Sequence, residues 1–183
     1  MRKRRDAFVA ERISRGIAPA IQPSRELLAL FKPAMVVASY IALGSEADPA
    51  ALTAAACDAG CIIALPRVEN RSSPMRFLRW EAGETLEIGA FGLSQPHQSA
   101  PDIVPDIILM PFLAATRSGV RLGQGAGHYD RALAALPHAT RIGIGWSCQI
   151  VAQLPQDAWD IPLHAILTET SSAPNGTDNW IVP

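Results

Sequence analysis

The sequence has few cysteines, few aromatic residues and almost no net charge. Among 183 residues there are three cysteines, aromatic residues make up 6%, and the formal net charge is −1. Three cysteines without paired Cys-x-x-Cys spacing form neither a zinc site nor the dense disulfide framework of a small secreted domain. A chain without net positive charge has no overall attraction for nucleic acid or an anionic membrane. Any anionic ligand must therefore be held by local groups.

Long hydrophobic segments are also missing. No apolar stretch approaches the ~18 residues of a membrane span, and the N-terminus carries the basic run "RKRR" where a signal peptide would be apolar. We therefore expect a cytoplasmic protein without a nucleic-acid or membrane partner. The 49% content of hydrophobic residues is sufficient for the core of one domain, and we expect that domain to span 1–183.

The first part of the chain predicts helices followed by a strand, helix, strand unit. Residues 1–30 have helical spacing, and "MVVASYIAL" at 35–43 has the β-branched and aromatic content of a strand. Asp48 and Pro49 are typical of a helix start, and the helix would stop at Gly60. The next segment, "CIIALP", is a second strand candidate. Such a crossover implies parallel pairing of the two strands.

The rest of the chain continues this alternation. "DIILMP", "RIGIGW" and "HAILTE" are strand candidates, whereas "HYDRALAAL" and "SCQIVAQL" have helical spacing. Residues 66–105 suggest strands or a hairpin around Ala82 and Gly83, and 171–183 suggest a loose tail. We therefore predict a single-domain α/β fold, with a mainly parallel sheet flanked by helices on both faces.

The stretch "RLGQGAGHYDR" at 121–131 places glycine at every second position from Gly123 to Gly127. Alternating glycines let backbone N–H groups point into one concavity, and the helix that follows adds partial positive charge, so a phosphate chain is a suitable ligand. Arg121 would add a charged fork. The stretch is neither a P-loop nor a dinucleotide fingerprint, because the lysine is absent and His128 takes the place of the third glycine. Structural packing is the alternative explanation of the glycines.

The residues after the glycines admit two interpretations each. Asp130 falls in the first helical turn, where it could cap N–H groups or bind a magnesium ion that bridges phosphates. Tyr129 and His128 could pack in the core or touch a ligand ring.

Two segments, the first of which includes this stretch, resemble the 5-formyltetrahydrofolate cyclo-ligase family, also called methenyltetrahydrofolate synthetases. They are "PDIILMPFLAATRSGVRLGQGAGHYDRAL" and the downstream "RIGIGWSCQI...LPQDAWDIPLHAILTE". Weaker similarity extends upstream through "YIALGSEADP", "IALPRV" and "MRFLRW...AFGLSQP", so the resemblance covers nearly the whole chain and is strongest over 105–169.

The resemblance implies an α/β fold and a specific reaction. The family converts 5-formyltetrahydrofolate to 5,10-methenyltetrahydrofolate with ATP and Mg²⁺ and releases ADP and phosphate. In the implied mechanism the formyl oxygen attacks the γ-phosphate, and nitrogen 10 then closes the ring as phosphate leaves. The partners would be these small molecules, and we expect the protein to be a monomer.

The resemblance also implies roles for individual residues. Arg121 and Asp130 would be catalytic, and Asp130 and Asp160 would hold Mg²⁺. Folate would bind to Tyr40, Glu46, Gln124 and His128, with Glu46 accepting hydrogen bonds from the aminopyrimidine edge. Further candidates for the walls around the rings are Phe91, Phe112 and Trp146. ATP would bind to Lys3, Arg121, Leu122, Gly123, Gln124, Gly125, Ala126, Gly127, His128 and Tyr129. Without the resemblance, Glu46 would be an exposed loop acid and Asp160 a turn residue.

The sequence also departs from the family pattern. Family members carry an N-terminal lysine and an arginine four residues later, whereas this chain begins in the basic stretch that follows them. Arg2 or Lys3 would then substitute, or ATP binding is weaker, or the true start lies upstream. Internal replacements affect an aromatic residue, a carboxylate, a tyrosine and a glutamate, which are here Ala115, Thr116, His128 and Gln95.

Three functions are compatible with these observations. The leading interpretation is ATP-dependent ring closure. A non-catalytic protein that binds reduced folate would bind folate but not magnesium-ATP. An isomerase or transferase of similar fold would bind a sugar phosphate in the glycine loop, Gly123 to Gly127, and would catalyse its reaction without ATP.

Overall fold

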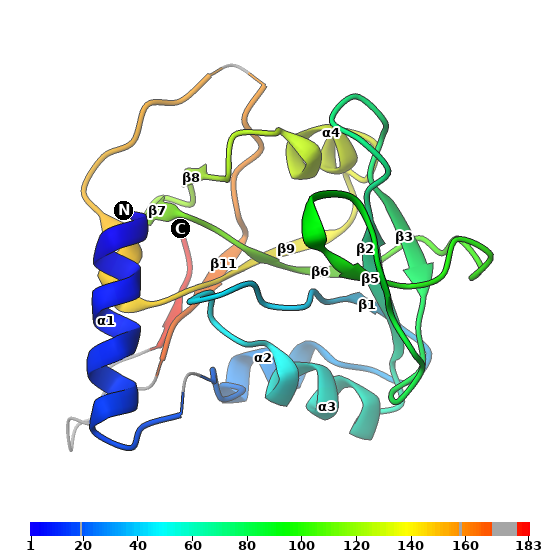
Figure 1. Ribbon diagram of the computed structural model, residues 1–183, viewed down its shortest axis with the longest axis horizontal. Helices are drawn as coiled ribbons and strands as arrows, with labels where there is room; N and C mark the ends of the chain where they lie inside the picture. The colour runs from blue at the N-terminus through cyan, green and yellow to red at the C-terminus, as the bar shows by residue number, and fades with distance from the viewer. Residues whose placement is uncertain (19, 158, 170–178) are drawn as a thin grey trace.

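A seven-stranded sheet forms the centre of the molecule (Figure 1). The structure is a computed structural model that describes residues 1–18, 20–157, 159–169 and 179–183. The order of the strands in the sheet is β12 (Trp180–Ile181), β11 (Ala165–Leu167), β9 (Thr140–Ile144), β6 (Ile107–Pro111), β1 (Val36–Ala38), β2 (Ile62–Arg67) and β3 (Arg76–Arg79). The five inner strands are parallel and the two edge strands antiparallel to their neighbours. The predicted mainly parallel sheet is therefore confirmed.

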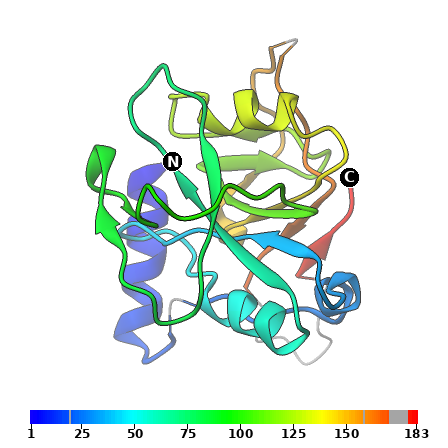
Figure 2. The ribbon, with the colours of Figure 1, turned by 90° about the vertical axis from the view of Figure 1, so that its right-hand side faces the viewer.

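Helices cover both faces of this sheet (Figures 1 and 2). In Figure 1, α2 (Arg25–Leu30) and α3 (Ala50–Asp58) lie below the sheet and α4 (His128–Ala134) lies above it. Strand β6 shows how the layers are held, because Ile107 and Leu109 join the buried cluster on the α3 face. The alternate residues Ile108 and Met110 join the cluster on the α4 face. A strand buried on both faces is continuously apolar, as the sequence of β6 predicted.

The remaining α-helix, α1 (Arg2–Ser14), lies at the carboxyl ends of the inner strands (Figure 1). It packs against η2 (Ser147–Gln149), a short 3-10 helix that follows β9. This edge of the sheet is where parallel α/β sheets commonly bind ligands, because loops from several strand ends meet there. The basic start of the chain therefore lies beside the carboxyl ends of the strands.

The strand, helix, strand unit is confirmed. The Asp48 carboxylate accepts a hydrogen bond of 2.9 Å from the Ala50 N–H at the start of α3. Gly60 has a φ of +78°, in the left-handed region that favours glycine, and the chain turns there into β2. Strands β1 and β2 then pair in parallel register.

Strand β1 is shorter than the predicted 35–43. The Ser39 N–H still bonds to the Ala64 carbonyl, but the chain then leaves the sheet. In the following loop, the Leu43 N–H donates to the Glu46 carboxylate at 3.0 Å, and Gly44 has a φ of +58°. These local bonds replace sheet pairing, because the loop must turn back towards α3.

Of the two alternatives predicted for residues 66–105, the strands form, whereas the hairpin around Ala82 and Gly83 does not. Strand β3 pairs with β2, whereas β4 (Glu87–Ile88) pairs with β5 (Ser94–Gln95) on either side of η1, a 3-10 helix at Ala90–Gly92. The backbone of β3 forms its hydrogen bonds with the free edge of β2, so β3 does not pair with β4.

Two predictions for the C-terminal part also differ from the structure. "SCQIVAQL" forms η2 and then β10 (Ile150–Val151), because Gln149 donates to the backbone carbonyl of Phe112 and Ile150–Val151 pair with β7 (Ala114–Thr116). Trp180–Ile181 form a strand against β11 rather than part of a loose tail. Residues 171–178 of the predicted tail lie outside the described residues.

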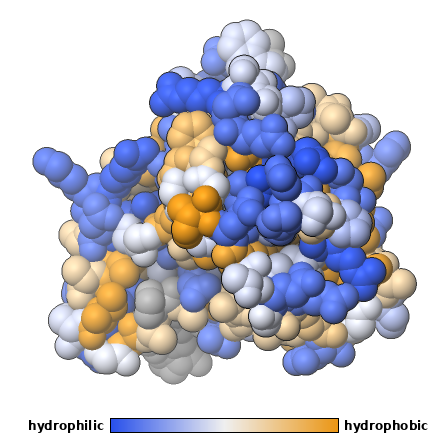
Figure 3. Space-filling model, turned by 45° about the vertical axis from the view of Figure 1, so that its right-hand side comes forward, coloured by the Kyte–Doolittle hydropathy of each residue, from blue (hydrophilic) through white to orange (hydrophobic). Residues whose placement is uncertain are grey.

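Polar residues cover much of the face that Figure 3 shows, and hydrophobic residues form separate patches between them. The most exposed large hydrophobic side chains include Ile88, Trp159 and Phe91, which are 73%, 70% and 57% exposed. Among the helices of the described residues, none combines the length and the apolar character that crossing a bilayer requires.

Candidate active site

The glycine loop connects a small second sheet to helix α4. Strand β8 (Arg121–Leu122) pairs with β7 in the three-stranded sheet β10-β7-β8. Gly125 and Gly127 have φ values of +94° and +64°, which favour glycine. A Cβ atom added to Gly123 or Gly125 would meet no atom within 4 Å. Packing therefore does not require glycine at Gly123 or Gly125, and the loop is open to a ligand.

Arg121, which lies in β8 just before this loop, makes hydrogen bonds through both of its terminal nitrogens. One terminal nitrogen, Nη2, donates to Oδ1 of Asp130 at 2.6 Å, and Nη1 donates to the carbonyl of Ile161 at 2.6 Å. The Arg121 side chain is 5% exposed and that of Asp130 is 29% exposed. Arg121 thus joins the first turn of α4 to the segment that carries Asp160.

Asp160 precedes Ile161 and forms a local turn. Its carboxylate accepts a hydrogen bond of 2.8 Å from the Asp157 N–H. Among the described residues, no three or more His, Cys, Asp or Glu side chains are grouped as metal ligands. Two aspartates and a phosphate chain would still offer the oxygen ligands that Mg²⁺ prefers, so the residues fit this ion chemically.

Glu46 lies at the centre of a second cluster. Its carboxylate, which is buried, accepts hydrogen bonds from the Leu43 N–H at 3.0 Å and from Gln124 Nε2 at 2.9 Å. Arg5 Nη1 of helix α1 is 3.8 Å from Glu46 Oε1. Three segments that are far apart in the sequence therefore meet at one carboxylate, and one of them is the glycine loop.

Helix α1 contributes two arginines to this cluster. Arg2 donates to the side-chain oxygen Oε1 of Gln124, and Arg5 Nε donates to Ser45 Oγ at 2.9 Å. The Lys3 side chain is exposed and makes no hydrogen bond or ion pair with any residue that the structure describes. Of the two substitutes that the sequence suggested, Arg2 and Lys3, the structure places Arg2 at this cluster and adds Arg5, one helical turn further along. The i, i+3 spacing of Arg2 and Arg5 was the available signal for Arg5, which the sequence analysis missed.

The negative charge of Glu46 affects the pKa values of two tyrosines. Burial, and next the negative charge of Glu46, raise the pKa of both Tyr40 and Tyr129. The Tyr40 hydroxyl donates to the Ala47 carbonyl at 2.5 Å. Both phenols are therefore neutral at physiological pH, and that of Tyr40 already has an acceptor in the protein.

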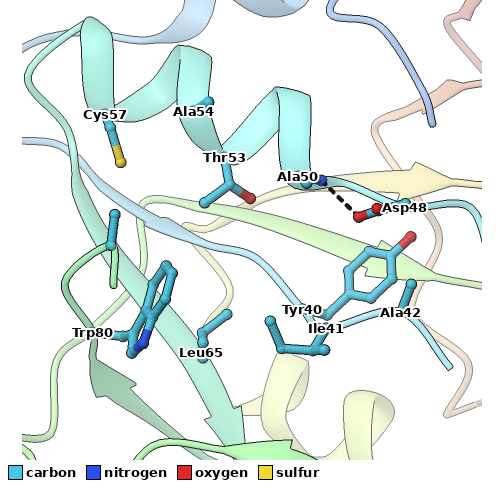
Figure 4. Close-up of a pocket in the computed structure, with 11 residues that line it drawn as sticks. Tyr40, Ile41, Ala42, Asp48, Ala50, Thr53, Ala54, Cys57, Leu65 and Trp80 are labelled. Atoms are coloured by element: carbon cyan, nitrogen blue, oxygen red, sulfur yellow. Dashed lines mark hydrogen bonds between the residues drawn. The ribbon is translucent and has the colours of Figure 1, made fainter. Parts of the chain in front are cut away.

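Tyr40 also lines a cavity of about 300 Å³ on the α3 face of the sheet (Figure 4). In this view its ring points towards Asp48, and Trp80 lies on the other side of the cavity. The lining is mostly apolar and includes Thr53 and Cys57 of α3. The glycine loop leads into α4, on the opposite face. The ring of Tyr40 therefore belongs to the α3 side, although its backbone leads to Glu46.

Comparison with known proteins identifies the family. The model of the 5-formyltetrahydrofolate cyclo-ligase family matches residues 1–169. The chain belongs to this family. It is 31% identical over 142 residues to the 5-formyltetrahydrofolate cyclo-ligase of Escherichia coli K12, with 74% of this chain and 78% of that protein covered. It is 33% identical over 144 residues to the cyclo-ligase of Mycolicibacterium smegmatis, with 72% of each chain covered.

Solved structures agree with this family membership. The Aquifex aeolicus 5,10-methenyltetrahydrofolate synthetase has a TM-score of 0.64 and 27% identity, over 92% of this chain and 89% of that chain. A 5,10-methenyltetrahydrofolate synthetase from Mycoplasma pneumoniae has the same fold, with a TM-score of 0.60 and 20% identity over 90% of this chain and 91% of that chain.

The aromatic candidates of this cyclo-ligase family member separate into core and surface. Phe112 and Trp146 are buried, and Trp146 Nε1 donates to the Ser45 carbonyl at 3.0 Å. Phe91 is exposed, and its ring centroid lies 6.1 Å from that of His128. Phe91 and His128 are therefore placed to border a ligand at the glycine loop, whereas Phe112 and Trp146 support the fold.

His128 has an environment that disfavours its charged form. Burial, then the positive charges of Arg131 and Arg71, lower its pKa. Arg131 Nη2 lies 3.0 Å from His128 Nδ1, so Nδ1 is suited to accept a hydrogen bond. His128 Nε2 is buried and has no hydrogen-bond partner among the described residues.

Three other departures from the family pattern have local structural roles. Thr116 Oγ1 is 2.8 Å from Ser118 Oγ and stabilises the turn between β7 and β8. Gln95 Oε1 accepts the Val68 N–H at 3.2 Å and fixes β5 beside β2. Ala115 is buried and pairs with Arg121 across β7 and β8. A larger side chain at Ala115 would have to find room in the core.

Proposed function

We propose that this protein converts 5-formyltetrahydrofolate to 5,10-methenyltetrahydrofolate in a reaction that consumes ATP, requires Mg²⁺ and releases ADP and phosphate. The observation that carries the proposal is the hydrogen bond of 2.9 Å from Gln124 to Glu46. It links the loop suited to phosphate with the carboxylate suited to the aminopyrimidine edge of folate. ATP and folate would therefore lie next to each other, as transfer between them requires.

The chemistry explains why a phosphate site is needed. The oxygen of a formamide leaves poorly, and phosphorylation of that oxygen converts it into phosphate, which leaves readily. When the formyl oxygen attacks the γ-phosphorus, the enzyme has to align the reactants and neutralise the negative charge. The backbone N–H groups of the open glycine loop suit this task. Nitrogen 10 then attacks the activated carbon, and phosphate departs as the ring closes.

Arg121 contributes charge and order. Both of its terminal nitrogens are engaged, one with Asp130 and one with the Ile161 carbonyl. We therefore assign Arg121 a fixed positive charge beneath the loop, which also orients the Asp130 carboxylate. In this arrangement Asp130 and Asp160 would hold Mg²⁺, which when bound supplies further positive charge to the phosphate chain.

Glu46 supplies the folate half of the site. In the structure it accepts two N–H donors, from the Leu43 backbone and the Gln124 amide. The 2-amino and N3–H groups of a pterin are donors of the same kind, so they can replace the Gln124 amide on this carboxylate. Phe91 and His128 would border the ring system from the loop side.

A direct absorbance assay tests the proposal. Purified protein is incubated with 5-formyltetrahydrofolate, ATP and Mg²⁺, and methenyltetrahydrofolate is followed by its absorbance near the edge of the visible range. We expect formation that stops when ATP is omitted or replaced by a non-hydrolysable analogue. No ATP-dependent signal would reject the proposal. Folate binding without magnesium-ATP binding in calorimetric titrations would instead indicate a non-catalytic binding protein.

A further inference from the structure

Arg5 has a buried nitrogen without a hydrogen-bond acceptor. The Arg5 side chain is 7% exposed, and its Nε donates to Ser45 Oγ at 2.9 Å. Nη1 is buried and finds no hydrogen-bond partner among the described residues. Glu46 Oε1, at 3.8 Å, is too distant for a hydrogen bond. Because a buried cationic donor without an acceptor is unfavourable, this position suits a ligand oxygen.

The carboxylate oxygen nearest to this nitrogen is occupied by an exposed glutamine side chain, which Arg2 also contacts. Glu46 Oε1, the oxygen nearest to Arg5 Nη1, accepts the hydrogen bond from Gln124 Nε2. Gln124 is exposed and stands between Gly123 and Gly125, which are surrounded by open space. The Gln124 side chain can therefore leave Glu46 without disturbing the core. Its departure would free an acceptor, Glu46, directly beside a donor, Arg5.

The order of groups on a pterin matches this pair. Along one edge the ring presents the 2-amino donor, the N3–H donor and the 4-oxo acceptor. A carboxylate can accept from the first two, and the third then requires a donor next to that carboxylate. Glu46 and Arg5 provide acceptor, acceptor and donor in the same sequence. Arg4, on the same helix, is exposed and makes no hydrogen bond or ion pair with the described residues.

We propose that Arg5 is a specificity-determining residue, whose Nη1 donates to the 4-oxo oxygen of the pterin while Glu46 accepts from the 2-amino and N3–H groups. This inference rests on the proposed function, because it identifies the heterocycle as the folate ring. It assigns to α1 a role in selecting folate, beside the role in ATP binding that the sequence suggested for the N-terminus.

A ligand pair that differs at position 4 of the ring tests the assignment. Folic acid carries an acceptor at position 4 and its 4-amino counterpart an amino donor there, and the 4-amino ring also lacks the N3–H. The effect of each substitution is therefore compared with the wild type separately for each ligand. The affinities of both ligands are measured by calorimetry without ATP for the wild type and for the Arg5→Met and Arg4→Met variants. We expect Arg5→Met to weaken folic acid about ten-fold or more, as for a lost hydrogen bond to a charged group. The 4-amino ligand should lose less than about two-fold, and Arg4→Met should affect neither.

The outcomes separate this inference from the proposed function. Equal losses for both ligands, or no loss for either, would overturn the role of Arg5 even if the wild type converts 5-formyltetrahydrofolate. A loss restricted to folic acid in a protein without ATP-dependent turnover would uphold Arg5 and reject the proposed reaction. If Arg5→Met does not fold, Arg5→Lys keeps the positive charge beside Glu46. It should still weaken folic acid more than the 4-amino ligand, and equal weakening would overturn the role.

Discussion

The two halves of the candidate site are built in different ways. In the phosphate half, Arg121 binds Asp130 and the Ile161 carbonyl, so the charged groups satisfy one another before any ligand arrives. In the folate half, Glu46 is bound by a displaceable glutamine amide, and the neighbouring Arg5 Nη1 has no acceptor in the described structure. The first half is thus preorganised, whereas under the proposed function the second would be completed by its ligand. Preorganised charge favours catalysis, and an incomplete hydrogen-bond set favours selection of the ligand that completes it.

The largest effect should come from the preorganised half. Asp130→Ala or Arg121→Ala should lower kcat/KM by about a thousand-fold, because charge stabilisation is the main contribution in phosphoryl transfer. Arg121→Ala should also lower Tm, since Asp130 would lose its partner. Steady-state kinetics and thermal melts check both. The control is Arg117→Ala, which removes an exposed arginine from the turn before β8. Full activity in both variants would contradict the assignment of the loop.

Glu46→Gln should have a smaller and more selective effect. The carboxamide replaces one acceptor oxygen by an NH2 donor and loses the charge, so it cannot accept the 2-amino and N3–H groups on two oxygens. The KM for 5-formyltetrahydrofolate should therefore rise about 10- to 100-fold. The KM for ATP should stay within about two-fold, because Glu46 serves only the folate half. Glu26→Gln, an exposed acid on α2, is the matched control. An unchanged KM for 5-formyltetrahydrofolate would remove Glu46 from the pterin site.

The glycine loop offers a matched pair of substitutions. An alanine at Gly123 or at Gly125 meets open space, but only Gly125 has a positive φ, of +94°. Gly125→Ala should therefore strain the loop by roughly 1–2 kcal/mol and raise the KM for ATP several-fold. Gly123→Ala should change it little. Equal effects of the two variants would show that the backbone conformation of Gly125 is not required for ATP binding.

The smallest effect concerns pH and His128. Its pKa lies below the ordinary value of 6.5, since burial and two arginines disfavour the imidazolium. As pH falls through about 6.5 the unfolded chain binds a proton that the folded protein binds less readily, so stability should decrease. Thermal melts between about pH 8 and 5.5 should show a smaller decrease for His128→Asn than for the wild type. His138→Asn, at an exposed position, should retain the wild-type slope.

The proximity of Arg121 and Asp130 in the proposed phosphate half could be expected because it is local in the sequence. Arg121 and Asp130 are nine residues apart, on either side of the loop that the glycines marked. Their pairing follows from one strand, loop, helix connection. The parallel sheet was predictable for a similar reason, since strands such as β6 are short apolar runs that alternate with helical segments. What sequence did not indicate is that Arg121 holds Asp130 itself.

The folate half required contacts over long distances in the chain. Glu46 and Gln124 are 78 residues apart, and Arg5 reaches Ser45 across 40 residues. A similar limit explains the aromatic candidates. Phe112 is buried because Gly145 leaves room for its ring, where a Cβ atom would lie 2.4 Å from a ring carbon. No local pattern distinguishes such a core aromatic from Phe91, which is exposed.

By itself the sequence determined the α/β alternation, the family and the open glycine loop, because apolar periodicity and alternating glycines act through neighbouring residues. The folded chain adds that α1 brings Arg2 and Arg5 to the loop and to Glu46, whereas Lys3 is exposed. The physical reason is burial. The direction of a helix face, and the partner left for a buried charge such as Arg5, depend on which distant segments pack against it.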